Sequence, residues 1–217
     1  AWRARLLNGR DPNSLLCIYV GRLAVEKRVD LLLEVARTPG VALTIIGDGA
    51  QRTELEALFA GTGTHFTGYL FGEDLANAYA AADAFFFTGA AETFGQVVQE
   101  GLASGLPAVI INQGGITDLV THGLNGLICA DDPREFAAAA RLLRDDLNLR
   151  QQMSAAACSG VESNSWEATL AQLEDHYREA IRLNDRLNDM YPPQPSLFST
   201  LLNRGTPPTR KVHERVS

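Results

Sequence analysis

Two glutamates in a short stretch of this chain are spaced in a way that suits the binding of hydroxyl groups. Glu92 and Glu100 lie eight residues apart and bracket Phe94 and Gly95, where a helix is expected to begin. A small residue at a helix start lets an anion approach backbone N–H groups, which favour negative charge. Carboxylates beside such a site accept hydrogen bonds from hydroxyls. An anion on the amides with hydroxyls on the carboxylates suits a sugar nucleotide.

Two cations follow the first apolar run of the sequence. Arg22 is expected just beyond a buried strand, and Lys27 near the start of the next helix. An arginine binds phosphate oxygens in pairs, whereas a lysine acts as a point charge. Together they could clamp a diphosphate at the same edge as the glutamates. The alternative is that both are solvated surface charges, with Glu26 as a neighbouring partner.

The same two glutamates also allow a different chemistry. Glu92 and Glu100 could form a general acid/base pair like that of glycoside hydrolases, which act through two carboxyl groups. That interpretation leaves Phe94, Gly95 and the two cations without a role. Hydroxyl binding is therefore the favoured interpretation, and the acid/base pair stays open.

Short apolar runs alternate with amphipathic segments along the first part of the chain. This rhythm predicts βαβ units and an α/β fold with a doubly wound parallel sheet, whose ligand lies beyond the carboxyl ends of the strands. Three further helices and a Pro-rich tail are expected to follow. The expected strands are 15–20, 41–46, 65–67, 84–87, 107–111 and 127–129, and the expected helices are 27–37, 51–60, 73–81, 95–104, 116–121, 133–144, 149–158 and 165–183.

The composition divides the chain into three parts. Residues 1–14 are polar and arginine-bearing, and are expected to form a linker or a short opening helix. Residues 15–183 carry the strand and helix patterns of one nucleotide-sugar-binding domain. Residues 184–217 are rich in Pro, Asn and Arg, and are expected to form an extended or disordered tail.

Bulk properties exclude several classes of protein. The net charge of −7 argues against general nucleic-acid binding, which needs a basic surface. No apolar run approaches the roughly 20 residues that span a bilayer. The sequence contains neither a P-loop nor the GxGxxG fingerprint, which disfavours an NTPase or an NAD dehydrogenase. Three widely separated cysteines, Cys17, Cys129 and Cys158, predict buried thiols in a reducing, cytoplasmic compartment rather than disulfides or a zinc site.

Several motifs, in order, resemble one known family. They resemble the nucleotide-sugar-binding C-terminal domain of retaining GT-B glycosyltransferases, in the glycosyl transferases group 1 family, over residues 15–181. The wording of residues 87–94 is most similar to the mannosyltransferase and sulfoquinovosyltransferase branches, which glycosylate lipids. The resemblance implies the Rossmann-like half of a GT-B fold. The motifs are residues 19–23 with 26–27, 46–49, 66–68, 92–100 with 103–107, and 114–115.

The resemblance also implies roles for individual residues. Arg22 and Lys27 would neutralise the diphosphate and stabilise the leaving nucleotide, and Glu92 would hold hydroxyls of the donor sugar. Glu100 would bind the ribose. No metal and no cofactor besides the nucleotide-sugar donor are implied. The remaining implied donor contacts are Gly21, Thr93, Phe94, Gly95 and Val97, together with Gly68 and Tyr69, which would meet the base.

Two departures from the family pattern stand out, and one part of the family's enzymes is expected to be missing. Gln99 stands where the family often has an apolar residue, and Gly101 where it often has Ala. The family's N-terminal acceptor-binding domain has no expected counterpart here. By resemblance, the whole enzyme would transfer a hexosyl group from GDP-mannose or a UDP-glucose-type donor to a glycolipid, with peripheral membrane contact left open. Two alternatives remain: a nucleotide-sugar 2-epimerase and a non-catalytic nucleotide-sugar binding module.

Overall fold

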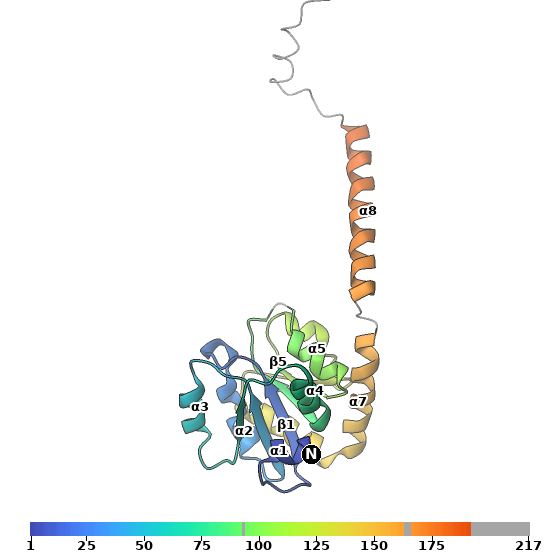
Figure 1. Cartoon of the computed structure of the whole chain (residues 1–217). Coiled ribbons are helices and arrows are strands. Elements are labelled where there is room, and N and C mark those ends of the chain that lie inside the picture. Colours follow the sequence, from blue (N-terminus) through green and yellow to red (C-terminus); the bar gives the residue numbers. More distant parts are fainter. Residues whose placement is uncertain (93, 163–165, 192–217) are drawn as a thin grey trace, which may run out of the picture. The chain divides into compact units, whose positions relative to one another are not determined.

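The structure of the chain is a computed structural model that describes residues 1–92, 94–162 and 166–191 (Figure 1). The chain divides into two compact units, Ala1–Ser165 and Trp166–Ser217. Thr93, one of the predicted donor contacts, lies outside the described residues. So does the part of the predicted tail from residue 192 onward.

Six parallel strands form one sheet in the first unit. Their order is β3-β2-β1-β4-β5-β6, so the direction of winding reverses between β1 and β4. This is the strand order of the doubly wound Rossmann fold, and the predicted fold class is confirmed. The strands are β1 (Leu15–Val20), β2 (Val41–Ile46), β3 (His65–Gly68), β4 (Ala84–Phe87), β5 (Ala108–Ile111) and β6 (Gly126–Cys129).

The central strands owe their position to continuous apolar sequence. Every residue of β1, β2, β4 and β5 is buried, as expected for strands covered on both faces. β1 pairs with β2 from Leu15 opposite Val41 to Val20 opposite Ile46. On its other side, β1 pairs with β4 through Ile18 opposite Phe85. The core of the unit therefore lies along both faces of these strands.

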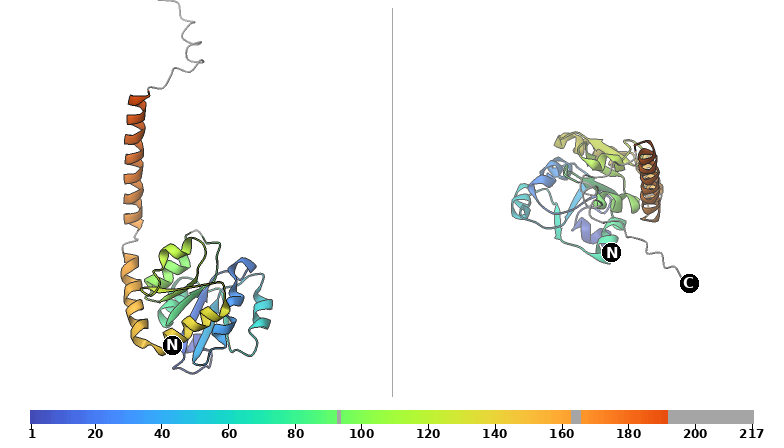
Figure 2. Two further views of the ribbon diagram at one scale, coloured as in Figure 1. Left: turned by 180° about the vertical axis from the view of Figure 1, so that it is seen from behind. Right: turned by 90° about the horizontal axis from the view of Figure 1, so that it is seen from above.

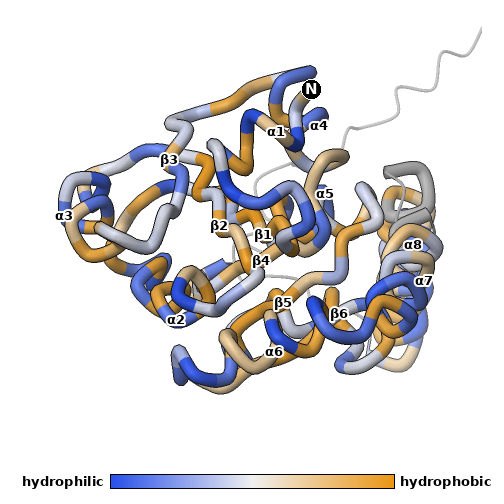
Figure 3. The backbone as a smooth tube through the Cα atoms, turned by 90° about the horizontal axis from the view of Figure 1, so that it is seen from below, coloured by the Kyte–Doolittle hydropathy of each residue, from blue (hydrophilic) through white to orange (hydrophobic). Residues whose placement is uncertain are grey.

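Helices cover both faces of the sheet, as Figures 2 and 3 show. The helices α2 and α6 lie on one face, and α1, α4 and α5 lie on the other. Apolar positions of each helix point towards the sheet, which produces the amphipathic pattern seen in the sequence. The helices of this unit are α1 (Trp2–Leu7), α2 (Leu33–Ala36), α3 (Arg52–Leu58), α4 (Gly72–Ala81), α5 (Gln96–Ala103), α6 (Pro133–Asp145) and α7 (Leu147–Glu162), with the 3-10 turn η3 (Gly115–Leu119) between β5 and β6.

The opening residues are part of the sheet domain. Of the two forms expected for residues 1–14, the helix is confirmed as α1, and it is not a free linker. Leu6 and Leu7 are both buried, and α1 packs against β1, β2 and β3. Burying two leucines against the sheet contributes several kcal/mol at about 1.5–3 kcal/mol per side chain, which holds the segment on the domain.

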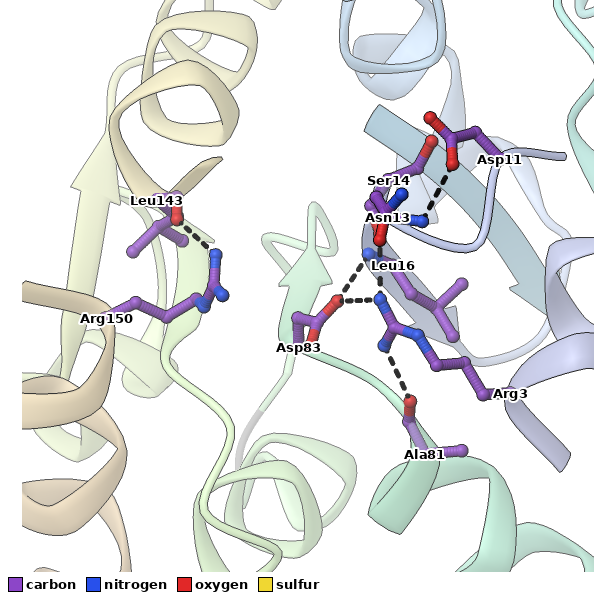
Figure 4. A network of polar contacts seen from close by, with 9 residues as sticks. All are labelled: Arg3, Asp11, Asn13, Ser14, Leu16, Ala81, Asp83, Leu143 and Arg150. Carbon is purple, nitrogen blue, oxygen red and sulfur yellow. Dashed lines mark hydrogen bonds and ion pairs between the residues drawn. The ribbon is translucent and has the colours of Figure 1, made fainter. Parts of the chain in front are cut away.

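One charged cluster fastens α1 to the amino-terminal edge of the sheet (Figure 4). Arg3 donates to the Ser14 carbonyl at 2.8 Å and to the Ala81 carbonyl at 3.2 Å, and pairs with Asp83 at 2.8 Å. Asp83 also accepts the backbone N–H of Leu16 at 2.7 Å. The cluster ties the helix, the start of β1 and the start of β4 together.

The helix expected over residues 27–37 is broken into three pieces. They are η1 (Val25–Lys27), η2 (Val29–Leu32) and α2. The break lies at Arg28, which has a left-handed backbone with φ of 49°. Its side chain is held by Asp131 at 3.0 Å and by Asp30 at 3.4 Å. The amphipathic pattern correctly identified buried residues such as Val29, but it cannot reveal a tertiary ion pair that favours a break.

The last predicted boundary was also wrong. The sequence predicted a helix ending at residue 183 and a tail from 184, whereas α8 (Trp166–Met190) continues through residues 184–190. Leu187 and Met190 extend the apolar spacing of this helix, and the pair Pro192-Pro193 comes only afterwards. In addition, α8 belongs to the second unit, whereas the sequence analysis assigned residues 166–183 to the same domain as the sheet. No helix in the described ranges is long and apolar enough to cross a membrane.

The prediction for the cysteines is confirmed at two of three positions. Cys17 and Cys129 are buried, and burial raises the pKa of the Cys129 thiol to about 12 and that of Cys17 still further. Cys158, in α7, is exposed, although its thiol donates to the Ala103 carbonyl at 3.8 Å. Burial was therefore the wrong expectation for Cys158.

The departure at Gly101 has a packing cause. A Cβ added at Gly101 would lie 2.9 Å from Cγ of Phe85, a fully buried side chain of β4. Cγ is the base of the ring and has little freedom to move. Glycine therefore lets α5 lie directly on the phenylalanine ring.

We expect Gly101→Ala to lower the free energy of unfolding by about 1 kcal/mol. The gain in helix propensity is about 1 kcal/mol, whereas overpacking a core costs about 1–3 kcal/mol. Chemical denaturation measures the change. The control is Gly160→Ala in α7, where an added Cβ meets no described atom within 4 Å. It should leave stability unchanged or raise it by up to about 1 kcal/mol. Equal stabilisation by both variants would contradict the packing explanation.

Candidate functional site

The loops that follow the strands pack tightly against each other at the carboxyl edge of the sheet. Gly47 has φ of 141°, and an added Cβ there would lie 1.9 Å from the carbonyl oxygen of Gly21. Gly114 has φ of 75°, and its added Cβ would lie 2.2 Å from the Ala90 carbonyl oxygen. Only glycine fits such approaches, since it has no Cβ. The predicted glycine-rich turns therefore gather at one edge.

Lys27 and Glu92 form an ion pair at the switch point between β1 and β4. The side chains are 12% and 29% exposed, respectively, so the pair is largely shielded from water. The Lys27 ammonium lies 5.8 Å from the centroid of the Phe87 ring. The hydroxyl of Thr88, a fully buried residue, donates to the Lys27 carbonyl at 2.6 Å. The first and fourth strands thus place a cation and a carboxylate in contact.

Tyr19 supports the Phe87 ring, which lies near the Lys27 ammonium. Its ring stacks on that of Phe87, with centroids 5.9 Å apart and planes 5° from parallel. The Tyr19 hydroxyl donates to the Arg22 carbonyl at 3.4 Å. Burial, followed by the nearby carboxylates of Glu92 and Glu26, raises the pKa of Tyr19 well above its ordinary value. The phenol therefore stays neutral and acts as a donor beneath the loop.

Arg22 lies at the same edge but is open to solvent. Its side chain is 64% exposed and pairs with Glu26 at 2.6 Å, as the alternative reading of the sequence expected. An added Cβ at Gly21 would lie 2.8 Å from the Tyr19 hydroxyl oxygen, so glycine at this position leaves room for the Tyr19 side chain. An exposed pair of this kind contributes only about 0.2–1 kcal/mol, and the guanidinium can therefore exchange Glu26 for another anion at little cost.

Glu100 has a partner that the sequence analysis did not identify. The hydroxyl of Tyr79, in α4, lies 3.0 Å from Oε2 of Glu100, in α5, and 3.4 Å from the Val97 carbonyl. Burial, followed by the charge of Glu100, raises the pKa of Tyr79. Glu92 and Glu100 thus interact with different groups, one with a cation and one with a phenol.

The segment between the glutamates presents an aromatic side chain and a helix start. Phe94 is 78% exposed. Gly95 has φ of 56° at the N-cap of α5, and its carbonyl accepts the N–H groups of Val98 and Gln99. The side-chain amide of Gln99 donates to the Phe94 carbonyl at 2.8 Å. The side chain of Gln99 therefore closes this loop, which accounts for the polar residue at a position where the family often has an apolar one.

The loop after β3 carries a second exposed aromatic group. Tyr69 follows Gly68, and its hydroxyl donates to the Asp48 carbonyl at 3.0 Å. Its ring stacks on Phe71, with centroids 5.8 Å apart. Asp48 pairs with Arg52 at 2.7 Å, and that hydrogen bond, with the N–H of Gly49, holds the pKa of Asp48 below its ordinary value. This loop meets the loop after β2 but shows no bonded contact with Glu100.

The structure brings some of the predicted residues together and adds others. Lys27 and Glu92 touch, whereas the partner of Arg22 is Glu26 and that of Glu100 is Tyr79. The sequence analysis missed three supporting residues, Tyr19, Thr88 and Tyr79. Tyr19 and Thr88 lie in or beside apolar runs assigned to the core. A tyrosine within the Ala-rich segment 76–82 was the one signal available for Tyr79.

The architecture defines a broad class of protein. Doubly wound parallel sheets bind ligands in the crevice outside the carboxyl ends of the strands at the switch point, and nucleotides are typical ligands there. Here that point carries Lys27 and Glu92. Residues 3–159 match the family model of the glycosyl transferases group 1, and the chain belongs to this family. The resemblance seen in the sequence is thus confirmed.

Two relatives illustrate the membership. A GDP-mannose-dependent alpha-mannosyltransferase of Corynebacterium glutamicum is 40% identical over 181 residues, which cover 82% of this chain and 43% of the relative. Sulfoquinovosyl transferase SQD2 of Arabidopsis thaliana is 37% identical over 185 residues, which cover 82% of this chain and 36% of the relative. The chain spans less than half the length of these curated relatives.

A solved structure shares the fold. The crystal structure of Anabaena HepE in complex with UDP-glucose matches with a TM-score of 0.70 and 24% identity. The match covers 82% of this chain and 52% of that one. The predicted Rossmann-like half of a GT-B fold is therefore confirmed.

The different burial of the two cations leads to a stability prediction. We expect Lys27→Met to lower the free energy of unfolding by about 1–3 kcal/mol, because it leaves the Glu92 carboxylate shielded and unpaired. Arg22→Met should cost less than about 0.5 kcal/mol, since its pair is exposed. Urea denaturation of both variants measures the difference.

A double variant provides the internal control. Lys27→Met combined with Glu92→Gln removes both charges, so it should be more stable than Lys27→Met alone. If Lys27→Met and Arg22→Met had equal effects, or if the double variant lost the sum of the single losses, the pair would not stabilise the edge.

Proposed function

We propose that this chain is the donor-binding part of a retaining glycosyltransferase that uses a nucleotide-diphospho-sugar. The observation that carries the proposal is the contact between Lys27 and Glu92 at the switch point of the sheet, with Arg22 in the same loop as Lys27. Arg22 and Lys27 match a diphosphate in charge. Glu92 and Glu100 match the hydroxyls of a sugar and of a ribose. Family membership supports the same assignment.

We propose a role for each predicted donor contact, supported by the ion pair between Lys27 and Glu92 and by family membership. Arg22 and Lys27 bind the diphosphate, with the backbone of Gly21 close to it. Glu92 binds hydroxyls of the donor sugar, and the segment from Thr93 to Val97 lines this part of the site with the amides of Phe94 and Gly95. Glu100 binds the ribose, and the loop at Gly68 and Tyr69 meets the base.

The proposed transfer step requires positive charge beside the leaving diphosphate. As the bond between the anomeric carbon and the diphosphate oxygen breaks, negative charge develops on the diphosphate. Fixed cations that are already in place stabilise that charge without reorganisation, which is the largest single contribution in many enzymes. In our proposal Lys27, held by Thr88 and Phe87, is the preorganised cation, and Arg22 is the mobile one.

The names of the relatives support two donor types. A GDP-mannose-dependent relative supports GDP-mannose, and the UDP-glucose complex of HepE supports a UDP-glucose-type donor. We propose a glycolipid acceptor, in line with the resemblance to lipid-glycosylating branches. Such an acceptor would place the whole enzyme at the cytoplasmic face of a membrane, as a peripheral protein.

Calorimetry tests the binding proposal directly. We expect the 217-residue chain to bind at least one of GDP, UDP and ADP, and Arg22→Ala to weaken that binding. We also expect no sugar transfer by the chain alone, because its longer relatives contain a further part. Absence of binding to all three nucleotides would refute the proposal, and measured turnover by the chain alone would refute the need for that further part.

Replacing Glu92 in the Lys27–Glu92 pair should affect the binding of two ligands in opposite directions. A diphosphate that binds Lys27 must displace Glu92, so we expect Glu92→Gln to tighten the binding of a free nucleoside diphosphate about 3- to 10-fold, worth about 1 kcal/mol. The same variant should weaken the binding of the matching nucleotide sugar, relative to the diphosphate, because a carboxylate on the sugar hydroxyls is lost. Competition calorimetry measures both dissociation constants.

Glu26→Gln is the matched control. It removes the same charge from the exposed pair with Arg22, so its effect on both ligands should be within about twofold. If Glu92→Gln changed both dissociation constants in the same direction and by the same factor, Glu92 would act through charge alone.

A further inference from the structure

A buried phenol holds an exposed carboxylate between two helices of the domain. Tyr79 is only 3% exposed, whereas Glu100 lies on the exposed side of α5. The Tyr79 hydroxyl is 3.0 Å from Oε2 of Glu100. Tyr79 is neither part of the family motifs recognised in the sequence nor in direct contact with the Lys27–Glu92 pair.

The phenol is itself firmly positioned. Its ring packs against Phe85 with centroids 5.9 Å apart and planes 49° apart, and Phe85 is fully buried in β4. A tyrosine has only two side-chain rotations, so a packed ring fixes the direction of its hydroxyl. Burial and the neighbouring carboxylate also raise its pKa, so the hydroxyl keeps its proton and donates it. Glu100 therefore meets a donor with a single fixed direction.

The second oxygen of the carboxylate is left for another group. Within the described part of the chain, Oε1 of Glu100 has no hydrogen-bond partner. Beside it, α4 and α5 border a hollow of about 430 Å³, lined by Leu75, Ala76 and Ala103 among others. A carboxylate held by one oxygen at the edge of a partly apolar hollow presents its other oxygen to a ligand.

We propose that Tyr79 is a positioning residue that orients Glu100 towards the ribose hydroxyls of the nucleotide. This inference rests on the proposed nucleotide-sugar site. Tyr79 does not touch the ligand; it restricts the side chain of Glu100 to the orientation that binds the ribose. Long side chains lose rotamer freedom on binding, and a carboxylate that is already oriented loses less.

A purely structural role explains the contact less well. The Val97 carbonyl, 3.4 Å away, already offers the buried hydroxyl an acceptor, so Tyr79 does not require a carboxylate at position 100. An exposed glutamate, in turn, does not require a protein partner, because water solvates it. The contact is therefore better explained by the orientation that it imposes on the Glu100 side chain.

The experiment compares two ligands and two variants of the 217-residue chain. The ligands are the nucleoside diphosphate that binds tightest among GDP, UDP and ADP, and its 2′,3′-dideoxy counterpart. For Tyr79→Phe we expect about a 5- to 10-fold loss of affinity for the ribonucleotide, less than the full worth of a hydrogen bond to a charged group, because Tyr79 acts only through Glu100. Binding of the dideoxy nucleotide should stay within twofold. Glu100→Gln should show the same selectivity, and the double variant should lose no more than Glu100→Gln alone.

The controls separate the possible outcomes. Tyr177→Phe, an exposed tyrosine of the second unit, should change neither dissociation constant. Equal weakening of both ligands by Tyr79→Phe would reveal a structural role and overturn the inference, as would an unchanged affinity for the ribonucleotide. If wild type bound the ribonucleotide and the dideoxy nucleotide equally, Glu100 would not read the ribose. If wild type bound no nucleotide at all, the proposed function itself would fail, which is a distinct result.

Discussion

The parallel pairing of β1 with β4 is the interaction on which the site depends. Cys17 pairs with Ala84 and Ile18 with Phe85, and the stacked rings of Tyr19 and Phe87 continue this contact to the carboxyl ends of the two strands. Because the chain leaves the two strands in opposite directions, their loops part at this point and a crevice forms. The same pairing delivers one charge from each loop, and the ion pair between Lys27 and Glu92 is its consequence.

The sequence predicted the fold well because burial on both faces leaves a strong signal. A strand covered by helices on either side must be apolar throughout, and β1, β2 and β4 begin and end where their apolar runs do. The site was predictable to the extent that it depends on chain direction. Residues that follow parallel strands must share an edge, so the sequence alone predicts that Arg22, Lys27 and Glu92 lie close together.

Where prediction failed, the cause was an interaction between distant parts of the chain or a limit of composition as a guide. The break at Arg28 depends on Asp131, more than a hundred residues away. Tyr79 looked like a core residue because its ring is one, and only the position of α5 shows what its hydroxyl meets. At α8, composition suggested a tail from residue 184, while the apolar spacing still favoured a helix.

The exposure of this edge bears on how its charges work. Arg22, Tyr69 and Phe94 are all open to water on the described chain, and water weakens the attraction between a cation and a phosphate severalfold relative to a protein interior. In the proposed enzyme, a second body that covered the edge would bury the aromatic rings and exclude this water. The same cations would then act on the diphosphate far more strongly. In the proposed enzyme, shielded Lys27 would therefore define where the diphosphate lies, and open Arg22, which already contributes on the exposed edge, would bind the diphosphate more strongly once the site is covered.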